Sequence, residues 1–298
     1  MSSESSFEFT KDNIDTYLKA VAKEYRKLVG KNMPAELILI GGASLLVNYG
    51  FRSMTTDVDA LINAASAMKD AINNVRDKYN LPNGWLNTDF INTASYSDKL
   101  YQFSVYYRTY SNIVTVRTID AEYLIAMKLR AGRQYKRDLS DIIGILTEHK
   151  RRGNPITFER IAGAVNDLYG SWGSLPDYSQ QFIENVMSAG RYEEMYKQVY
   201  EAEIKTKELL ISFEQKYPNV ANDNNINQIT DTLKKNNSES IVNKLKNKTA
   251  NVKQIEGRVP RYNAATEAAI NEANDISFGK KVVKTYSSAE KMFEDLNQ

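Results

Sequence analysis

The feature that most constrains the fold is an apolar run, "AELILI" at residues 35–40, which stops at Gly41 and Gly42. A short apolar run of this kind is typical of a buried strand, and the two glycines after it predict a sharp turn. The next segment, "ASLLVNYG", predicts a short helix that begins at the glycines, and "TDVDALI" predicts a second strand. We therefore expect a strand, a turn, a short helix and a second strand in direct succession.

Further helices and strands are predicted on both sides of this unit. Apolar residues at spacings of three and four predict an amphipathic helix at 13–29. Two runs rich in aromatic and β-branched residues, 100–110 and 112–119, predict strands joined by a Ser-Asn turn. A sheet of four or more strands is therefore expected. Other predicted helices cover 64–80, 121–132 with Asp120 as its N-cap, 136–150, 157–170 and 178–216.

These elements predict an α+β fold, with a mixed sheet flanked by helices and an all-helical region after it. We expect the sheet-bearing domain to span residues 1–150 and a helical domain to span 151–217. The segment "YPNVANDNNINQ" is rich in Asn and predicts a linker. Residues 218–298 are predicted to combine this linker with helices whose apolar stripes are thin, so that part of the region is flexible.

Composition excludes several classes of function. The chain has no cysteine, which excludes disulfides, thiolate zinc sites and cysteine nucleophiles. Its 39 basic and 37 acidic side chains give no overall charge that would favour nucleic acid or a membrane surface. The polar start lacks the pattern of a signal peptide, and no apolar run approaches the ~20 residues of a membrane span. We expect a soluble cytoplasmic protein with no membrane partner.

The Gly41-Gly42 turn has the properties of a phosphate site. A strand that ends in a tight turn and leads directly into a helix exposes backbone N–H groups with partial positive charge. Ser44 adds a hydroxyl group in the first turn of the predicted helix. A Gly-Gly turn of this kind also occurs as a simple tight connection, so the turn alone leaves both interpretations open.

Asp57 and Asp59 have the properties of a metal site. Residues two apart on a strand point to the same face, so the two carboxylates are expected to lie together and to repel each other. A pair of this kind is stable if it is solvated, if one member is protonated, or if a divalent cation lies between them. Magnesium is bound by carboxylate and phosphate oxygens, so a phosphate-binding turn next to the pair favours a site for a metal and a triphosphate.

Two sequence blocks resemble a known family. "IGGASLLVNYGFRSMTTDVDALI" resembles the signature of the polymerase-beta-like nucleotidyltransferase fold, in which Gly-Gly or Gly-Ser is followed by a strand that carries Asp-x-Asp. "RSMTTDVDA" is similar to a bacterial subgroup with a minimal fold that includes the AbiEii-type toxins of toxin–antitoxin systems. The later block, "DAEYLIAMKLRAGRQYKRDLSDIIGIL", is similar to a helical motif of that subgroup. Its matching positions are Lys128, Arg133, Asp138 and Asp141, and the resemblance covers about residues 35–148.

The resemblance implies transfer of a nucleoside monophosphate from an NTP to a hydroxyl group of RNA, protein or a small molecule. Asp57 and Asp59 would bind Mg²⁺ and take part in catalysis. Other residues would contact the nucleotide, namely Gly41, Gly42, Ser44, Arg52, Lys128 and Arg133. Many active members carry a third carboxylate on a later central strand, but runs 100–110 and 112–119 contain no acidic residue. Either Asp138 or Asp141 supplies a catalytic carboxylate from the helix, or the site is weakly active.

The resemblance also implies partners. The acceptor would be tRNA or a protein, and a cognate antitoxin or a second copy would bind the C-terminal helices. A toxin or defence component is therefore one expectation. The alternative is a non-catalytic binding protein of the same fold that acts through its helical C-terminal half. A plain RNA-binding module has little support from the charge balance.

Several residues allow two interpretations. Asp138 and Asp141, three residues apart on a helix, form either a wall of the site or a solvated face with local ion pairs. Arg52 either contacts a phosphate or pairs with Asp57. The only histidine, His149, is expected at a helix end, where a cation is favoured. The strand aromatics are expected mainly in the core, with base stacking as the alternative; they are Tyr101, Phe103, Tyr106, Tyr107 and Tyr110.

Overall fold

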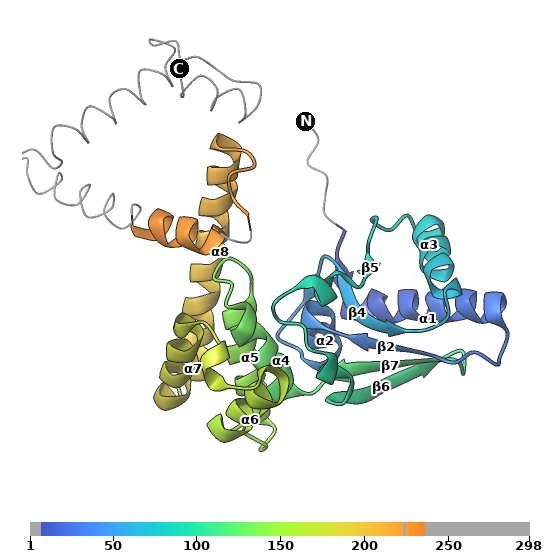
Figure 1. Ribbon diagram of the computed structural model, residues 1–298, viewed down its shortest axis with the longest axis horizontal. Helices are drawn as coiled ribbons and strands as arrows, with labels where there is room; N and C mark the ends of the chain where they lie inside the picture. Colours follow the sequence, from blue (N-terminus) through green and yellow to red (C-terminus); the bar gives the residue numbers. More distant parts are fainter. Residues whose placement is uncertain (1–6, 223–224, 236–298) are drawn as a thin grey trace, which may run out of the picture. The chain divides into compact units, whose positions relative to one another are not determined.

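The computed structural model describes residues 7–222 and 225–235. Its order of elements follows the sequence prediction closely (Figure 1). The helices are α1 (Lys11–Val29), α2 (Gly41–Asn48), α3 (Ala67–Tyr79), α4 (Ala121–Ala131), α5 (Asp138–Arg151), α6 (Phe158–Tyr169), α7 (Asp177–Ala189) and α8 (Tyr192–Lys216). The strands are β1 (Phe9–Thr10), β2 (Ala35–Leu39), β3 (Met54–Thr55), β4 (Val58–Asn63), β5 (Leu86–Asn87), β6 (Ser104–Tyr110) and β7 (Val114–Ile119).

Five strands form one mixed sheet in the order β5-β4-β2-β7-β6. The central strand β2 pairs antiparallel with β4 and parallel with β7, while β6 and β7 form an antiparallel hairpin. The hairpin turn uses Ser111 and Asn112, both with positive φ, which is the backbone geometry that matches the twist of paired strands. β1 and β3 form a separate two-stranded sheet. The predicted fold class, a mixed sheet flanked by helices and followed by helices, is confirmed.

The apolar run at β2 is continuous because both faces of this strand are buried. Leu37 and Leu39 belong to one core together with α1 and α3, whereas Ile38 and Ile40 belong to a second core together with α4 to α7. Alternate residues of a strand point to opposite faces, so the part of β2 that lies between the two cores, Leu37 to Leu39, is apolar at every position, while Glu36 near the start of the strand is only partly buried. This arrangement places the end of β2, and the glycines after it, between the two helical layers.

The helical half of the described chain packs on the sheet domain through α4 and α5. α6 packs against α4, and α8 packs against α5 (Figure 1). The predicted helix at 178–216 is two helices, because Gly190 adopts a left-handed φ of 63° that ends α7. The predicted domain limits at residues 150 and 217 stay predictions. Of the predicted region 218–298, the structure describes 218–222 and 225–235, including a helix at 226–235, and the rest lies outside the described residues.

The aromatic side chains of the β6 region depart from the predicted core. Tyr110 is buried, but Tyr106 is 63 % exposed and Tyr101 is 39 % exposed. Phe103 stacks on Tyr123 with 3.9 Å between ring centroids. β6 is an edge strand, so fewer neighbours cover its side chains than cover a central strand. Among the residues that the structure describes, no helix is long and apolar enough to cross a bilayer.

Candidate active site

The turn after β2 and the start of β4 lie side by side. The backbone N–H of Ile40 donates to the carbonyl of Asp59 at 2.9 Å. Gly41 has a φ of 54°, and a Cβ atom placed on it would lie 3.8 Å from Asp59 Oδ2. The N-cap residue of α2 is Ile40, whose side chain makes no capping hydrogen bond, so the first N–H groups of the helix keep their capacity to bind an anion. The predicted phosphate-binding turn therefore faces the predicted metal-binding carboxylate.

Asp57 and Asp59 are close, but they do not share a strand. β4 begins at Val58, so Asp57 precedes the strand and is exposed, while Asp59 within it is half-buried. This corrects the expectation that both residues project from one regular strand. Burial raises the pKa of the Asp59 carboxyl, and the Asp57 charge raises it further, while a side-chain hydrogen bond from Asn87 opposes both effects. The two carboxylates thus repel each other in the protein.

Two cations of the α4–α5 loop act on this carboxylate pair. Arg133 and Lys136 both interact electrostatically with Asp59, and Lys136 also interacts with Asp57. Lys136 reaches solvent, but the packing around its ammonium group and the neighbouring Arg133 lower its pKa. The site therefore combines two acidic groups, two basic groups and a helix N-terminus within one region.

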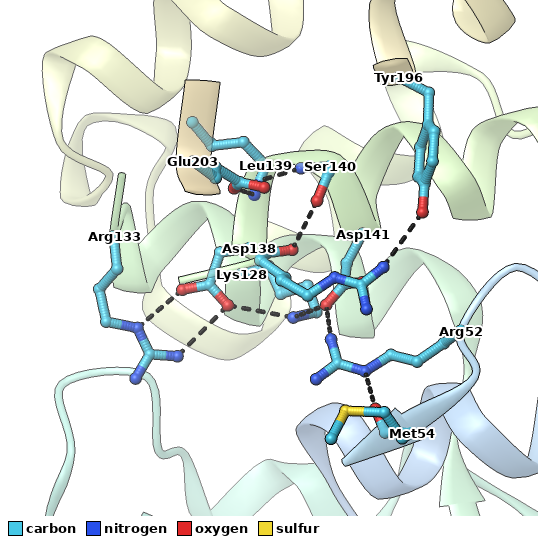
Figure 2. A network of polar contacts seen from close by, with 11 residues as sticks. Arg52, Met54, Lys128, Arg133, Asp138, Leu139, Ser140, Asp141, Tyr196 and Glu203 are labelled. Atoms are coloured by element: carbon cyan, nitrogen blue, oxygen red, sulfur yellow. Dashed lines mark hydrogen bonds and ion pairs between the residues drawn. The ribbon is translucent and has the colours of Figure 1, made fainter. Parts of the chain in front are cut away.

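The second sequence block forms a buried ionic network (Figure 2). Lys128, which is 7 % exposed, donates to Asp138 Oδ1 at 3.0 Å and to Asp141 Oδ2 at 2.9 Å. Asp138 also accepts from Arg133 Nε at 2.7 Å, and Asp141 accepts from Arg52 Nη1 at 2.5 Å. Burial tends to raise the pKa of Asp138, but the charges of Lys128 and Arg133 outweigh it and hold this pKa at about 2.

The network decides between the interpretations that the sequence left open. Asp138 is 2 % exposed and Asp141 is fully buried, so the solvated helix face is wrong. Arg52 pairs with Asp141 rather than with Asp57, and its Nε donates to the carbonyl of Met54 at 3.2 Å. Both carboxylates pair with Lys128 inside the protein, and the buried Oδ1 of Asp141 has no hydrogen-bond partner among the described residues. Arg52 and Arg133 are the members that extend toward the turn and the carboxylate pair.

Arg52 lies beside the glycine turn. A Cβ atom on Gly42 would lie 3.1 Å from Arg52 Nη2 and 2.5 Å from Thr55 Oγ1. Only glycine leaves room for these two side chains next to the N-terminus of α2. Ser44, predicted to contact the phosphate, is fully buried, and its Oγ has no hydrogen-bond partner in the described residues. At the surface of the turn, the backbone N–H groups and Arg52 are therefore the groups available to an anion, and the buried Ser44 hydroxyl group is not.

The carboxylates present fit magnesium in its usual protein setting. Within residues 7–222 and 225–235, no group of three His, Asp or Glu side chains is placed to hold a metal ion, so a third carboxylate ligand is not found there. Magnesium is commonly held by one or two carboxylates together with substrate phosphates. Asp57 and Asp59 supply two carboxylates, and the turn of α2 supplies the adjacent place for phosphates.

Residues 16–147 match the model of a family described as "Nucleotidyltransferase of unknown function (DUF6036)". This match indicates a nucleotidyltransferase-family domain. It runs from α1 to α5, includes the whole five-stranded sheet and both sequence blocks, and spans less than half of the 298 residues. No curated protein and no solved structure matches the chain. The nucleotidyltransferase part of the predicted resemblance is thus supported.

The candidate site and its surroundings include residues that the sequence did not single out. Asn87 lies on β5, a strand of two residues, and pairs in register with Asp59. Lys136 was not among the residues predicted for the site. Glu203 lies far along the chain on α8, and no local pattern marks it. Of these three residues, only Asn87 had a usable signal in the sequence, because it directly follows the apolar residues Trp85 and Leu86, which the structure shows to be buried.

His149 of α5 is not a simple helix-end cation. Its Nε2 lies 3.1 Å from the hydroxyl group of Tyr49, which is buried. Burial lowers the pKa of His149, although a backbone hydrogen bond from Asn154 opposes this, so the neutral ring is favoured. The contact of His149 with Tyr49 links α5 to the residue that follows α2, and His149 does not act there as a helix-end cation.

Proposed function

We propose that the chain is a Mg²⁺-dependent nucleotidyltransferase that moves a nucleoside monophosphate from an NTP to an acceptor hydroxyl group. The observation that carries this proposal is the contact between the N-terminus of α2 and Asp59, whose Oδ2 lies 3.8 Å from a Cβ position on Gly41. A triphosphate bound at the turn would have its oxygens next to the two carboxylates. The match of residues 16–147 to a nucleotidyltransferase family supports the same reaction class.

Each group of the site has a distinct role in this proposal. The N–H groups of Gly41 and Gly42 bind phosphate oxygens through partial positive charge. Asp57 and Asp59 would hold Mg²⁺, which would neutralise phosphate charge and activate the acceptor oxygen. Arg52 contributes a planar guanidinium group beside the turn, and Arg133 and Lys136 contribute positive charge next to the carboxylates.

Asp138, Asp141 and Lys128 have a supporting role in this proposal. Their charges are satisfied by one another and by two arginines, so they orient Arg52 and Arg133 instead of reacting with substrate. This differs from the expectation that Asp138 or Asp141 supplies a catalytic carboxylate and that Lys128 contacts the nucleotide. A carboxylate whose pKa is about 2 is also a poor general base near neutral pH.

Label transfer tests the reaction. The full-length protein is incubated with each α-labelled NTP, Mg²⁺, total tRNA and cell protein, and the products are separated. We expect label on one class of acceptor, and a loss of at least about 100-fold in the double variant Asp57→Asn, Asp59→Asn. Asp70→Asn, an exposed carboxylate in α3, is the matched control and should keep full activity. No transfer with any NTP, or full transfer by the double variant, would contradict the proposal.

The acceptor and the biological role rest on the resemblance to the AbiEii-like subgroup. We propose tRNA or a protein as acceptor, a toxin or defence role, and a cognate antitoxin that binds the C-terminal helices. Expression in bacterial cells tests this role, because a toxin slows growth and the double variant Asp57→Asn, Asp59→Asn does not. Equal growth with both proteins would contradict the toxin role but would leave the proposed reaction untouched.

One observation favours a second candidate, a binding protein that does not catalyse transfer. The described residues provide no third carboxylate for a metal, and α8 exposes Ile204 and Ile211. Calorimetry separates the two candidates. Absence of NTP and Mg²⁺ binding, together with a stable protein complex that is lost on truncation after residue 217, would support the second candidate.

A further inference from the structure

Helix α5 lacks an N-terminal cap of its own. The residue at its N-cap position is Arg137, whose side chain makes no capping hydrogen bond. The first N–H groups of a helix have no partner within the helix, and a buried helix start needs an acceptor from elsewhere. α5 begins in a buried part of the protein, with Asp138, Leu139 and Ser140 all buried.

Glu203 of α8 supplies the missing acceptor. Its Oε1 accepts the backbone N–H of Leu139 at 2.9 Å and that of Ser140 at 3.4 Å (Figure 2). Glu203 is 3 % exposed, and its Oε2 has no hydrogen-bond partner among the described residues, so the hydrogen bonds of this buried carboxyl group to the start of α5 are made by Oε1. The two helices are held at a second point by Arg137, which donates to the hydroxyl group of Tyr196 at 3.2 Å and lies over the ring of Tyr200.

The same turn of α5 holds the arginine of the nucleotide site. Asp141 follows Ser140 directly and fixes Arg52 through an ion pair of 2.5 Å. Arg52 in turn lies 3.1 Å from the Cβ position of Gly42. A continuous series of contacts therefore leads from α8 through the first turn of α5 to the phosphate-binding turn, although Glu203 lies outside the segment that matches the nucleotidyltransferase family.

We propose that Glu203 is a positioning residue, through which α8 fixes the first turn of α5 and so holds Arg52 at the nucleotide site. This inference rests on the proposed function and assigns to the helical half of the chain a part in nucleotide binding. Removal of the Glu203 carboxyl group frees the N–H groups of Leu139 and Ser140 and allows the turn that carries Asp141 to shift. Arg52 then loses its fixed place beside Gly42.

Two variants of Glu203 and one control test the proposal in the full-length protein. Glu203→Ala removes the acceptor, whereas Glu203→Gln keeps an oxygen that can accept the same two hydrogen bonds. Thr206→Ala is the matched control, because Thr206 is a buried residue of the same helix whose hydroxyl group bonds only to the Ala202 carbonyl of α8. All three are first compared for thermal unfolding, so that loss of structure is recognised.

Amide hydrogen exchange, the NMR signal of Arg52 and steady-state kinetics are the three measurements. In Glu203→Ala we expect faster exchange of the Leu139 and Ser140 amides, a changed NMR signal of the Arg52 Nε–H group, and a rise in KM for the NTP of about tenfold or more. In Glu203→Gln and Thr206→Ala we expect the Arg52 signal and KM to stay within about twofold of the wild type. If Glu203→Ala does not fold, the inference requires that Glu203→Gln gives the same Arg52 NMR signal as the wild type and a KM within about twofold of it.

The outcomes separate this inference from the proposed function. Faster amide exchange with an unchanged Arg52 signal would show that the cap is purely local and would overturn the inference. An equal rise in KM in Thr206→Ala would overturn it as well, because the effect would then be general to α8. A wild type that is inactive with every NTP would defeat the proposed function alone, since the Arg52 signal still reports on Glu203.

Discussion

At the scale of single residues, Gly42 is a position of the candidate site where an added side-chain atom would be poorly tolerated. A Cβ atom there would lie 2.5 Å from Thr55 Oγ1, closer than side chains pack, and 3.1 Å from Arg52 Nη2. Gly42→Ala should therefore destabilise the protein by about 1–3 kcal/mol and weaken NTP binding, because Thr55 or Arg52 must move. Urea unfolding and NTP titration measure the two effects.

Gly50→Ala is the matched control for Gly42→Ala. A Cβ atom on Gly50 meets nothing within 4 Å, so this change should leave stability and NTP binding nearly unaltered. Equal effects of the two substitutions would show that the close contacts at Gly42 do not matter.

Glu203 makes a separate prediction about pH. Burial raises the pKa of Glu203 from 4.5 to about 7, and the charge of Asp141 adds to the rise, although hydrogen bonds from Ser140 and Leu139 oppose it. The folded state thus binds a proton more tightly than the unfolded state. The resulting stabilisation is complete below pH 4.5 and is lost as the pH rises to about 7.

Urea unfolding of the wild type and of Glu203→Gln between these pH values checks the sign. Relative to Glu203→Gln, the unfolding free energy of the wild type should fall by up to about 1.4 kcal/mol per pH unit. Other titrating groups, such as Asp59 and His149, are common to both proteins and cancel in the comparison. A difference that is independent of pH would contradict the raised pKa.

At the residue scale, the sequence predicted that Gly41 and Asp59 lie close together, and they do. The reason is that β2, which Gly41 follows, and β4, which carries Asp59, are neighbours in the sheet. The partners of Asp138 and Asp141 were harder to predict. Arg52 precedes Asp141 by 89 positions and Glu203 follows Leu139 by 64, and periodicity contains no information about such contacts.

At the scale of elements, the ionic network joins the segment after α2 to helices α4 and α5. Asp141 is fully buried and neutralises both Lys128 and Arg52. Asp141→Asn should destabilise the protein by about 3–5 kcal/mol, because two cations would be left without their shared partner. Denaturant unfolding measures this loss.

Glu193→Gln is the control for Asp141→Asn. It breaks the exposed pair with Arg151 and should leave the unfolding midpoint unchanged. A stable Asp141→Asn protein with unchanged NTP binding would show that the network neither stabilises α5 nor orients Arg52.

The elements themselves were largely predictable, and the departures have physical causes. Helices such as α1 and α4 follow from apolar spacing and from the Asp120 cap, which the structure shows accepting the N–H of Ala121. β5 has two residues, too few for any alternation of side chains to appear. The division between α7 and α8 at Gly190 was not predicted. A helical pattern with a single glycine does not by itself distinguish a tolerated glycine from a left-handed cap.

At the scale of the whole molecule, the helical half contacts the proposed nucleotide site through α5. Three residues that follow α2 attach to this helix: Tyr49 contacts His149, Phe51 packs on Gly144, and Arg52 pairs with Asp141. A Cβ atom on Gly144 would lie 2.6 Å from the Phe51 ring, so the close approach depends on glycine. The segment between the phosphate-binding turn and the carboxylates is therefore held by α5, which α8 caps in turn.

Calorimetric titration of the full-length protein with a non-hydrolysable NTP, with and without Mg²⁺, tests the central claim most directly. We predict binding that requires Mg²⁺, that is lost in the double variant Asp57→Asn, Asp59→Asn, and that is retained in Asp70→Asn. The reason is that the carboxylates hold the metal beside the phosphates at Gly41 and Gly42. Absence of binding, or equally tight binding to the double variant, would contradict a nucleotide site at this turn.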